Sequence, residues 1–201
     1  MSEKDTIRSF VAVDVTAPVH AAIAALQAEL ARVRADVRWV RAEGMHVTLK
    51  FLGSVDSGLL ERVRAALVVA LAERPALEVG VRGTGAFPSL RRPRVLWVGL
   101  DGAGLSELAG IVDAALLPLG FAPEKRSFAA HVTLGRVNSL RGWPALEEQF
   151  KAHLDDDFGS SRIDAVTIYR STLRAGGAVY SALWTIPLCR HREGSTHDPR
   201  R

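Results

Sequence analysis

The tetrapeptide His-Val-Thr-Leu occurs twice in the chain, at residues 46–49 and again at 131–134. The sequence contains only six histidines, and a chance repeat anchored on so rare a residue is expected on the order of once in a hundred such chains. On a β-strand, successive side chains point to opposite faces. Each copy should therefore bury its valine and leucine and present its histidine and threonine on the other face.

Two imidazoles and two hydroxyls on facing strands suit the cleavage of a phosphodiester. Displacement at phosphorus requires a base that activates the nucleophile and an acid that protonates the leaving oxygen, and histidine can take either role near neutral pH. Threonine hydroxyls can donate hydrogen bonds to the non-bridging oxygens in the transition state. We therefore predict that His46 and His131 are catalytic, that Thr48 and Thr133 bind the phosphate, and that neither a metal ion nor a cofactor is needed.

The sequence lacks the motifs of several other enzyme classes. It contains no GxxxxGK[ST] phosphate loop, no GxSxG nucleophile motif and no HExxH zinc motif. A single cysteine, Cys189, excludes an internal disulfide framework and a multi-cysteine zinc site. These absences weaken the hypotheses of a nucleotide hydrolase, a serine hydrolase and a metalloenzyme.

The segments around the two copies predict an α+β fold. Strand patterns cover residues 7–15, 37–40, 46–52, 76–87 and 94–100, and helical spacing covers 19–33, 58–74, 104–120 and 143–154. Two final strand patterns, 162–173 and 178–188, predict a closing hairpin across residues 174–177. Short connections and alternating strands favour antiparallel pairing. We expect two similar lobes, and we expect the first two helices to cover the strands of their own half of the chain.

Composition and charge indicate the size of the core, the location of the protein and the charge of its partner. With 201 residues, 48% of them hydrophobic, the chain can bury a full core. Its N-terminus is charged and polar, and its longest apolar run is too short to span a bilayer. We expect a cytoplasmic monomer with one bilobal domain over residues 1–189 and a flexible tail over 190–201. The formal net charge of +4 favours an anionic partner.

The two motifs and their flanking segments resemble the two-histidine (2H) phosphoesterases, and among them the RNA 2′,3′-cyclic phosphodiesterases, also called 2′-5′ RNA ligases. The resemblance covers nearly the whole chain and is carried by IRSFVAVDV, VRWVRAEGMHVTLKFLG, GAFPSLRRPRVLWVGL, FAAHVTLGRV and VTIYRSTLRAGGAVYSAL. It implies a bilobal, two-fold pseudo-symmetric fold with two antiparallel sheets lining a central cleft and helices outside. It also implies metal-independent hydrolysis of a terminal RNA 2′,3′-cyclic phosphate to a 2′-phosphomonoester, with 2′-5′ RNA ligation as the reverse reaction.

The resemblance gives the two histidines different roles. If the 2′-phosphate remains, the 3′ oxygen leaves, and the resemblance makes His46 its proton donor and His131 the base that accepts a proton from water. Arg136 occupies the arginine position that commonly closes the second motif and is a secondary phosphate-binding candidate. Strict alternation would turn Arg136 away from His131, so this role requires a twist or bulge near Gly135. Lys50 should share the face of His46, either neutralising phosphate or exposed to solvent.

Two positions depart from the family pattern, and two other functions stay open. Ala130 stands where proline is common and Gly135 where alanine is common, which should make this strand edge more flexible. One alternative is a phosphodiesterase acting on small cyclic nucleotides or 2′-5′ oligonucleotides. The other is a non-catalytic module that binds RNA ends or nucleotides, although a pure binder would have no need of an acid and a base. The sequence leaves open the RNA substrate and the direction of the reaction in the cell.

Overall fold

The computed structural model describes residues 6–174 and 177–189 of the chain. Its elements in chain order are β1 (Thr6–Asp14), α1 (Ala17–Ala31), β2 (Val37–Trp39), the 3-10 helix η1 (Ala42–Gly44), β3 (His46–Asp56), α2 (Ser57–Leu71), β4 (Leu77–Phe87), β5 (Val95–Leu100), α3 (Ala103–Leu116), the 3-10 helix η2 (Leu117–Leu119), β6 (His131–Val137), α4 (Trp143–Ala152), β7 (Asp157–Ile163), β8 (Ala165–Arg174) and β9 (Gly177–Pro187). The predicted α+β class is confirmed. The tail expected over 190–201 lies outside the described residues.

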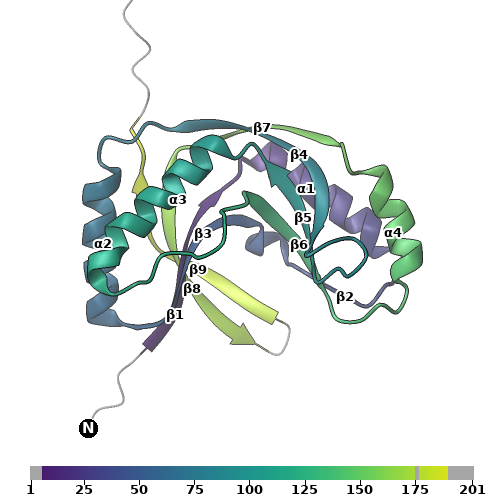
Figure 1. Ribbon diagram of the computed structural model, residues 1–201, viewed down its shortest axis with the longest axis horizontal. Coiled ribbons are helices and arrows are strands. Elements are labelled where there is room, and N and C mark those ends of the chain that lie inside the picture. Colours follow the sequence, from purple (N-terminus) through teal and green to yellow (C-terminus); the bar gives the residue numbers. More distant parts are fainter. Residues whose placement is uncertain (1–5, 175–176, 190–201) are drawn as a thin grey trace, which may run out of the picture.

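The strands form one curled antiparallel sheet with the helices on its outer side (Figure 1). The strand order is β7-β4-β5-β6-β3-β1-β8-β9, and β2 pairs with β6. We call β1, β3, β8 and β9 the first lobe, and β2, β4, β5, β6 and β7 the second lobe. The two sets of strands are joined where β3 pairs with β6, through Val47 and Val132. Both motifs therefore meet at the centre of the sheet.

The two lobes do not correspond to the two halves of the chain. Helix α1 packs on β7, α4 and β2 in the second lobe, whereas α3 packs on β3 and α2 beside the first (Figure 1). Strand β8 likewise returns from the second half to pair with β1. The expectation that the first two helices cover strands of their own half holds only in part for α1, which packs on β2 of the first half but also on β7 and α4 of the second. Periodicity identifies the apolar face of a helix, but not the sheet against which that face packs.

The segment 162–173, predicted as one strand, is divided between the lobes. Strand β7 ends at Ile163 and pairs with β4, whereas β8 begins at Ala165 and pairs with β1. Only Asp164 lies between them, and no glycine or proline marks the change of partner. The boundary depends on pairing between distant segments, which a local pattern does not contain. The predicted hairpin of β8 with β9 is confirmed by the pairing of Arg174 with Gly177.

Helix ends and the core follow ordinary sequence signals. The carboxylate of Asp56 caps α2 by accepting a hydrogen bond from the backbone N–H of Leu59 at 2.9 Å. One continuous hydrophobic core runs beneath the sheet, and both motifs contribute to it. Each motif is thus fixed to the core by its own apolar side chains.

Candidate active site

The two motifs begin the two strands at the centre of the sheet. Their valines and leucines, Val47, Leu49, Val132 and Leu134, are at most 4% exposed. Their histidines and threonines, His46, Thr48, His131 and Thr133, are half-buried on the opposite side of the strands. This division of each copy into buried apolar side chains and outward polar groups is as predicted. We call the side of the sheet that carries these four polar residues the histidine face.

The pairing of Val47 with Val132 determines how the four polar groups lie. Because antiparallel strands run in opposite directions, the same register sets His46 beside Thr133 and Thr48 beside His131. The two histidines then occupy one diagonal of a four-residue set and the two threonines the other, with about 7–8 Å between diagonal neighbours. A phosphate centred over this set would have an imidazole on two opposite sides and a hydroxyl on the other two.

A β-bulge follows the threonine of each motif. Leu49 is unpaired between Thr48 and Lys50 in the β1–β3 ladder, and Leu134 is unpaired in the same way in the β5–β6 ladder. One extra residue reverses the alternation of the residues after it. The residue five positions after each histidine consequently returns to the histidine face.

In the second motif that residue is Arg136. It pairs with Val95 of β5, and the alternate β5 residue Trp97 pairs with Thr133, so Arg136 and Thr133 share a face. The condition stated for a role of Arg136, a bulge near Gly135, is therefore met. In the first motif the equivalent residue is Phe51, which pairs with Phe10 and is 62% exposed.

Lys50 points to the other side, and the prediction that it shares the face of His46 is wrong. Its ammonium group is buried, forms an ion pair with Asp113 of α3 and donates a hydrogen bond to the carbonyl of Ala122 at 2.9 Å. The second oxygen of Asp113 accepts the backbone N–H of Glu124 at 3.1 Å. The bulge at Leu49 turns Lys50 toward the helices. Lys50 thus connects β3 to the segment that leads into the second motif.

His46 lies among three aromatic rings. Phe10 stacks on it at 4.6 Å between ring centroids, Tyr169 lies parallel at 5.7 Å, and Tyr180 meets it edge-on at 5.1 Å. The hydroxyl of Tyr169 donates a hydrogen bond to Asp14 at 2.7 Å. Burial, and secondly the charge of His131, lower the pKa of His46 to about 4. Without an anion beside it, His46 is therefore neutral near pH 7.

His131 is oriented by the main chain. Its Nδ1 lies 2.7 Å from the carbonyl oxygen of Ala129. Because a carbonyl can only accept, Nδ1 carries the hydrogen, and Nε2 of the neutral ring has a free lone pair. Burial lowers the pKa of His131, the hydrogen bond to Ala129 opposes that shift, and the charge of Arg136 adds to it. The neutral ring is thus held in the form that can accept a proton at Nε2.

Several residues around the site were missed at the sequence level. Gln27 of α1 donates two hydrogen bonds of 2.7 Å, to the carbonyls of Val40 and Leu134, and so supports the second bulge. No spacing in the sequence indicates this contact. Tyr169 and Tyr180 also lie beside His46. Their rarity was a possible sequence signal, because the chain contains only these two tyrosines.

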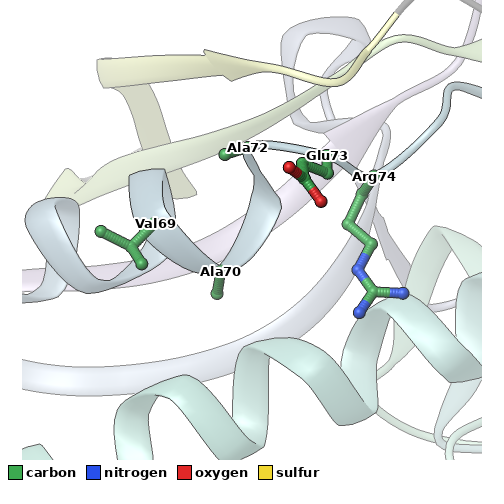
Figure 2. A pocket seen from close by; sticks show the side chains of 5 residues that line it. All are labelled: Val69, Ala70, Ala72, Glu73 and Arg74. Atoms are coloured by element: carbon green, nitrogen blue, oxygen red, sulfur yellow. The ribbon is translucent and has the colours of Figure 1, made fainter.

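Figure 2 shows a surface hollow at the end of α2. It is lined by Val69, Ala70, Ala72, Glu73 and Arg74. It contains no histidine and no hydroxyl, and it shares no residue with the histidine face. The candidate site therefore stays at the paired motifs.

Residues 6–174 and 177–189 contain no group of three or more His, Cys, Asp or Glu side chains placed to hold a metal ion. No helix among them is long and apolar enough to cross a membrane.

The chain is similar to curated RNA 2′,3′-cyclic phosphodiesterases. That of Methanothermobacter thermautotrophicus is 33% identical over 176 residues, which cover 87% of this chain and 95% of the relative. That of Aeropyrum pernix is 35% identical over 167 residues, which cover 82% and 93%. Each alignment thus includes nearly the full length of the relative concerned.

Solved structures and a family model agree with this similarity. The protein TT0787 of Thermus thermophilus superposes with a TM-score of 0.77 at 26% identity and covers 90% of this chain and 98% of its own. E. coli LigT complexed with 3′-AMP gives 0.70 at 26% identity, with 92% and 99% covered. The model of the LigT-like phosphoesterases matches twice, over residues 13–97 and 98–180, with one His-Val-Thr-Leu copy in each match. The chain belongs to the LigT-like phosphoesterase family.

Proposed function

We propose that this protein hydrolyses the terminal 2′,3′-cyclic phosphate of RNA to a 2′-phosphomonoester without a metal ion. The observation that carries the proposal is the register of β3 and β6, which sets two histidines on one diagonal and two threonines on the other. Curated relatives that bear the name RNA 2′,3′-cyclic phosphodiesterase support it, since they align over most of both chains. A LigT structure complexed with 3′-AMP supports a nucleotide ligand for this fold.

In the proposed reaction His131 is the base and His46 the acid. Nε2 of His131 removes a proton from water, the water oxygen forms a bond to phosphorus, and the bond from phosphorus to the 3′ oxygen breaks. His46 gives its proton to that oxygen, so the products are a 2′-phosphate and a 3′-hydroxyl. Burial lowers the pKa of His46 in the free protein. The bound anionic phosphate raises this pKa, so the ring takes up a proton from solvent before it acts as the acid.

The remaining groups act on the phosphate itself. Thr48 and Thr133 donate hydrogen bonds to the two non-bridging oxygens, where charge is stabilised in the transition state. Arg136, further along the same face, adds a positive charge that attracts substrate phosphate in a secondary role. One chain supplies all of these residues, which supports a monomer as the active form, and we place it in the cytoplasm. An RNA 5′-hydroxyl in place of water would give 2′-5′ ligation by the same proton transfers. Ligation is then a parallel opening of the cyclic phosphate and not, as expected from the resemblance, the reverse of its hydrolysis.

Product analysis tests the function directly. An oligoribonucleotide ending in a 2′,3′-cyclic phosphate should yield only the 2′-phosphate, at the same rate with and without a chelator. The 2′- and 3′-phosphate products are resolved by chromatography against synthetic standards. Exclusive formation of the 3′-phosphate would contradict the assigned leaving group, and loss of turnover in chelator would contradict the metal-free mechanism.

The lowered histidine pKa values predict an acidic pH optimum for the free enzyme. Turnover requires one neutral and one protonated ring, so kcat/KM rises with pH as the base loses its proton and falls as the acid loses its own. Burial lowers both pKa values below 6.5, so the maximum of kcat/KM should lie below pH 6.5. The profile of kcat should be displaced to higher pH because bound phosphate raises both pKa values. Steady-state rates between about pH 4 and pH 8 measure this, and a kcat/KM maximum near neutrality would refute it.

A further inference from the structure

Two arginines lie directly opposite each other beside the candidate site. Arg38 of β2 pairs with Arg136 of β6, and both residues are exposed. Directly paired residues of antiparallel strands share a face, with Cβ atoms about 4.5–5.5 Å apart, and like charges at such positions are destabilising. In the ranges 6–174 and 177–189, neither guanidinium has a carboxylate within ion-pair distance. The protein therefore maintains an uncompensated double positive charge on the histidine face.

The strand that carries Arg38 is firmly attached to β6. The backbone N–H of Asp36 donates to the carbonyl of Arg141 at 3.0 Å, and that of Asn138 donates to the carbonyl of Asp36 at 2.9 Å. The side chains of Asn138 and Ser139 also donate hydrogen bonds to the Asp36 carboxylate. At the other end of β2 the backbone N–H of Val40 donates to the carbonyl of Leu134 at 2.9 Å. Hydrogen bonds thus hold both ends of β2 against β6, and the fold determines the backbone position of Arg38.

Gly135 permits this close approach. A Cβ atom at that position would lie 2.7 Å from Val37 and 3.0 Å from Trp39, closer than packed atoms come. The space that a side chain would take at Gly135 is filled by the packed side chains of β2. The glycine lets Arg38 reach its place beside Arg136.

We propose that Arg38 and Arg136 form a second anion subsite, which binds the phosphodiester preceding the terminal nucleotide of an RNA substrate. The proposal rests on the proposed function and deepens it, because the subsite requires a substrate with at least one phosphodiester before its terminal nucleotide. Arg136 lies three positions after Thr133 on β6, about 10 Å along the strand, and its long side chain shortens the distance from its charge to the terminal phosphate. A free 2′,3′-cyclic mononucleotide has a single phosphate and would leave the subsite empty.

The first motif has no such charge at the equivalent position. The bulge that brings Arg136 to the histidine face brings Phe51 there in the first lobe. A planar aromatic ring can pack on a nucleobase but does not attract phosphate. The body of the RNA strand is therefore directed over the second lobe, toward β2.

The test compares two substrates, a trinucleotide ending in a 2′,3′-cyclic phosphate and a 2′,3′-cyclic mononucleotide. The measured quantity is the ratio of their kcat/KM values. Arg38→Gln should lower this ratio about tenfold, and it should reduce the slope of log kcat/KM against log salt for the trinucleotide by about 0.7–1. Arg38→Lys, which keeps the charge, should recover most of the ratio. Arg62→Gln, an equal charge change at an exposed position of α2, is the matched control and should leave the ratio unchanged.

The possible failures are distinguishable. An unchanged ratio in Arg38→Gln, or an equal fall in the Arg62→Gln control, would overturn the subsite while the proposed function stands. Absence of turnover of both substrates by the wild-type protein would overturn the proposed function, and the subsite with it.

Discussion

Replacing His131 by alanine should lower kcat on an RNA 2′,3′-cyclic phosphate by about 10³-fold, within the range of about 10² to 10⁴ for loss of a general acid or base. The reason is geometric, because the hydrogen bond from Nδ1 to Ala129 leaves Nε2 as the free lone pair on the histidine face. His131 is half-buried, and its ring meets that of Phe87 edge-on at 5.1 Å between centroids, so the thermal midpoint should fall only modestly. Single-turnover rates and circular dichroism check the two halves of this prediction.

His46 should give a loss of similar size, but glutamine is the better replacement. Alanine would leave a gap among Phe10, Tyr169 and Tyr180, whereas glutamine fills part of that space without titrating near neutral pH. Near wild-type turnover by either histidine variant would exclude the proposed mechanism.

A change in the leaving group separates the acid from the base. If the 3′ bridging oxygen is replaced by sulfur, the thiolate leaves without needing a proton. The His46→Gln variant should then recover much of its rate, while His131→Ala should remain slow because water still has to be activated. Equal recovery by both variants would mean that the roles of the two histidines are wrongly assigned.

Replacing Thr48 or Thr133 by valine should lower kcat by about 10²-fold, the size expected for loss of one hydrogen-bond donor to a developing anionic charge. Valine matches threonine in shape and strand propensity, so the pairing of β3 with β6 should persist. The effect should fall on kcat more than on KM, since the bond strengthens in the transition state.

The matched control for these variants is Thr172→Val, an exposed position on β8, which should leave kcat unchanged. If Thr48→Val and Thr133→Val also leave kcat unchanged, the two threonine hydroxyls contribute nothing to phosphate stabilisation.

The sequence was sufficient to predict the face on which each motif presents its polar groups, because strand alternation is a local property. It could not predict the direction of Lys50, since the bulge at Leu49 is visible only in the register between β3 and β1. The same bulge in β6 was foreseen only as a condition on Arg136. A single extra residue thus separates the correct prediction for the histidines from the incorrect one for the lysine.

The aromatic residues around His46 also could not be predicted from local sequence patterns. Its aromatic neighbours come from β1, β8 and β9, which are brought together by long-range pairing. Likewise, Arg38 is one of four arginines between residues 32 and 41, and only the β2–β6 register reveals its pairing with Arg136. Hydrophobic periodicity predicts elements, whereas their order in a sheet depends on contacts between distant segments.

The exchange of elements between the lobes determines the order in which the chain can complete its sheet during synthesis. Strands β1 and β3 can pair early, but the other edge of β1 has no partner until Ala165–Arg174 has left the ribosome. Strand β2 similarly waits for β6. An unpaired edge is a template for association with other chains, so the nascent protein carries this hazard until nearly its last strand is made. Cutting between residues 97 and 98, where the two family matches meet, would leave neither fragment with all the strands of either lobe.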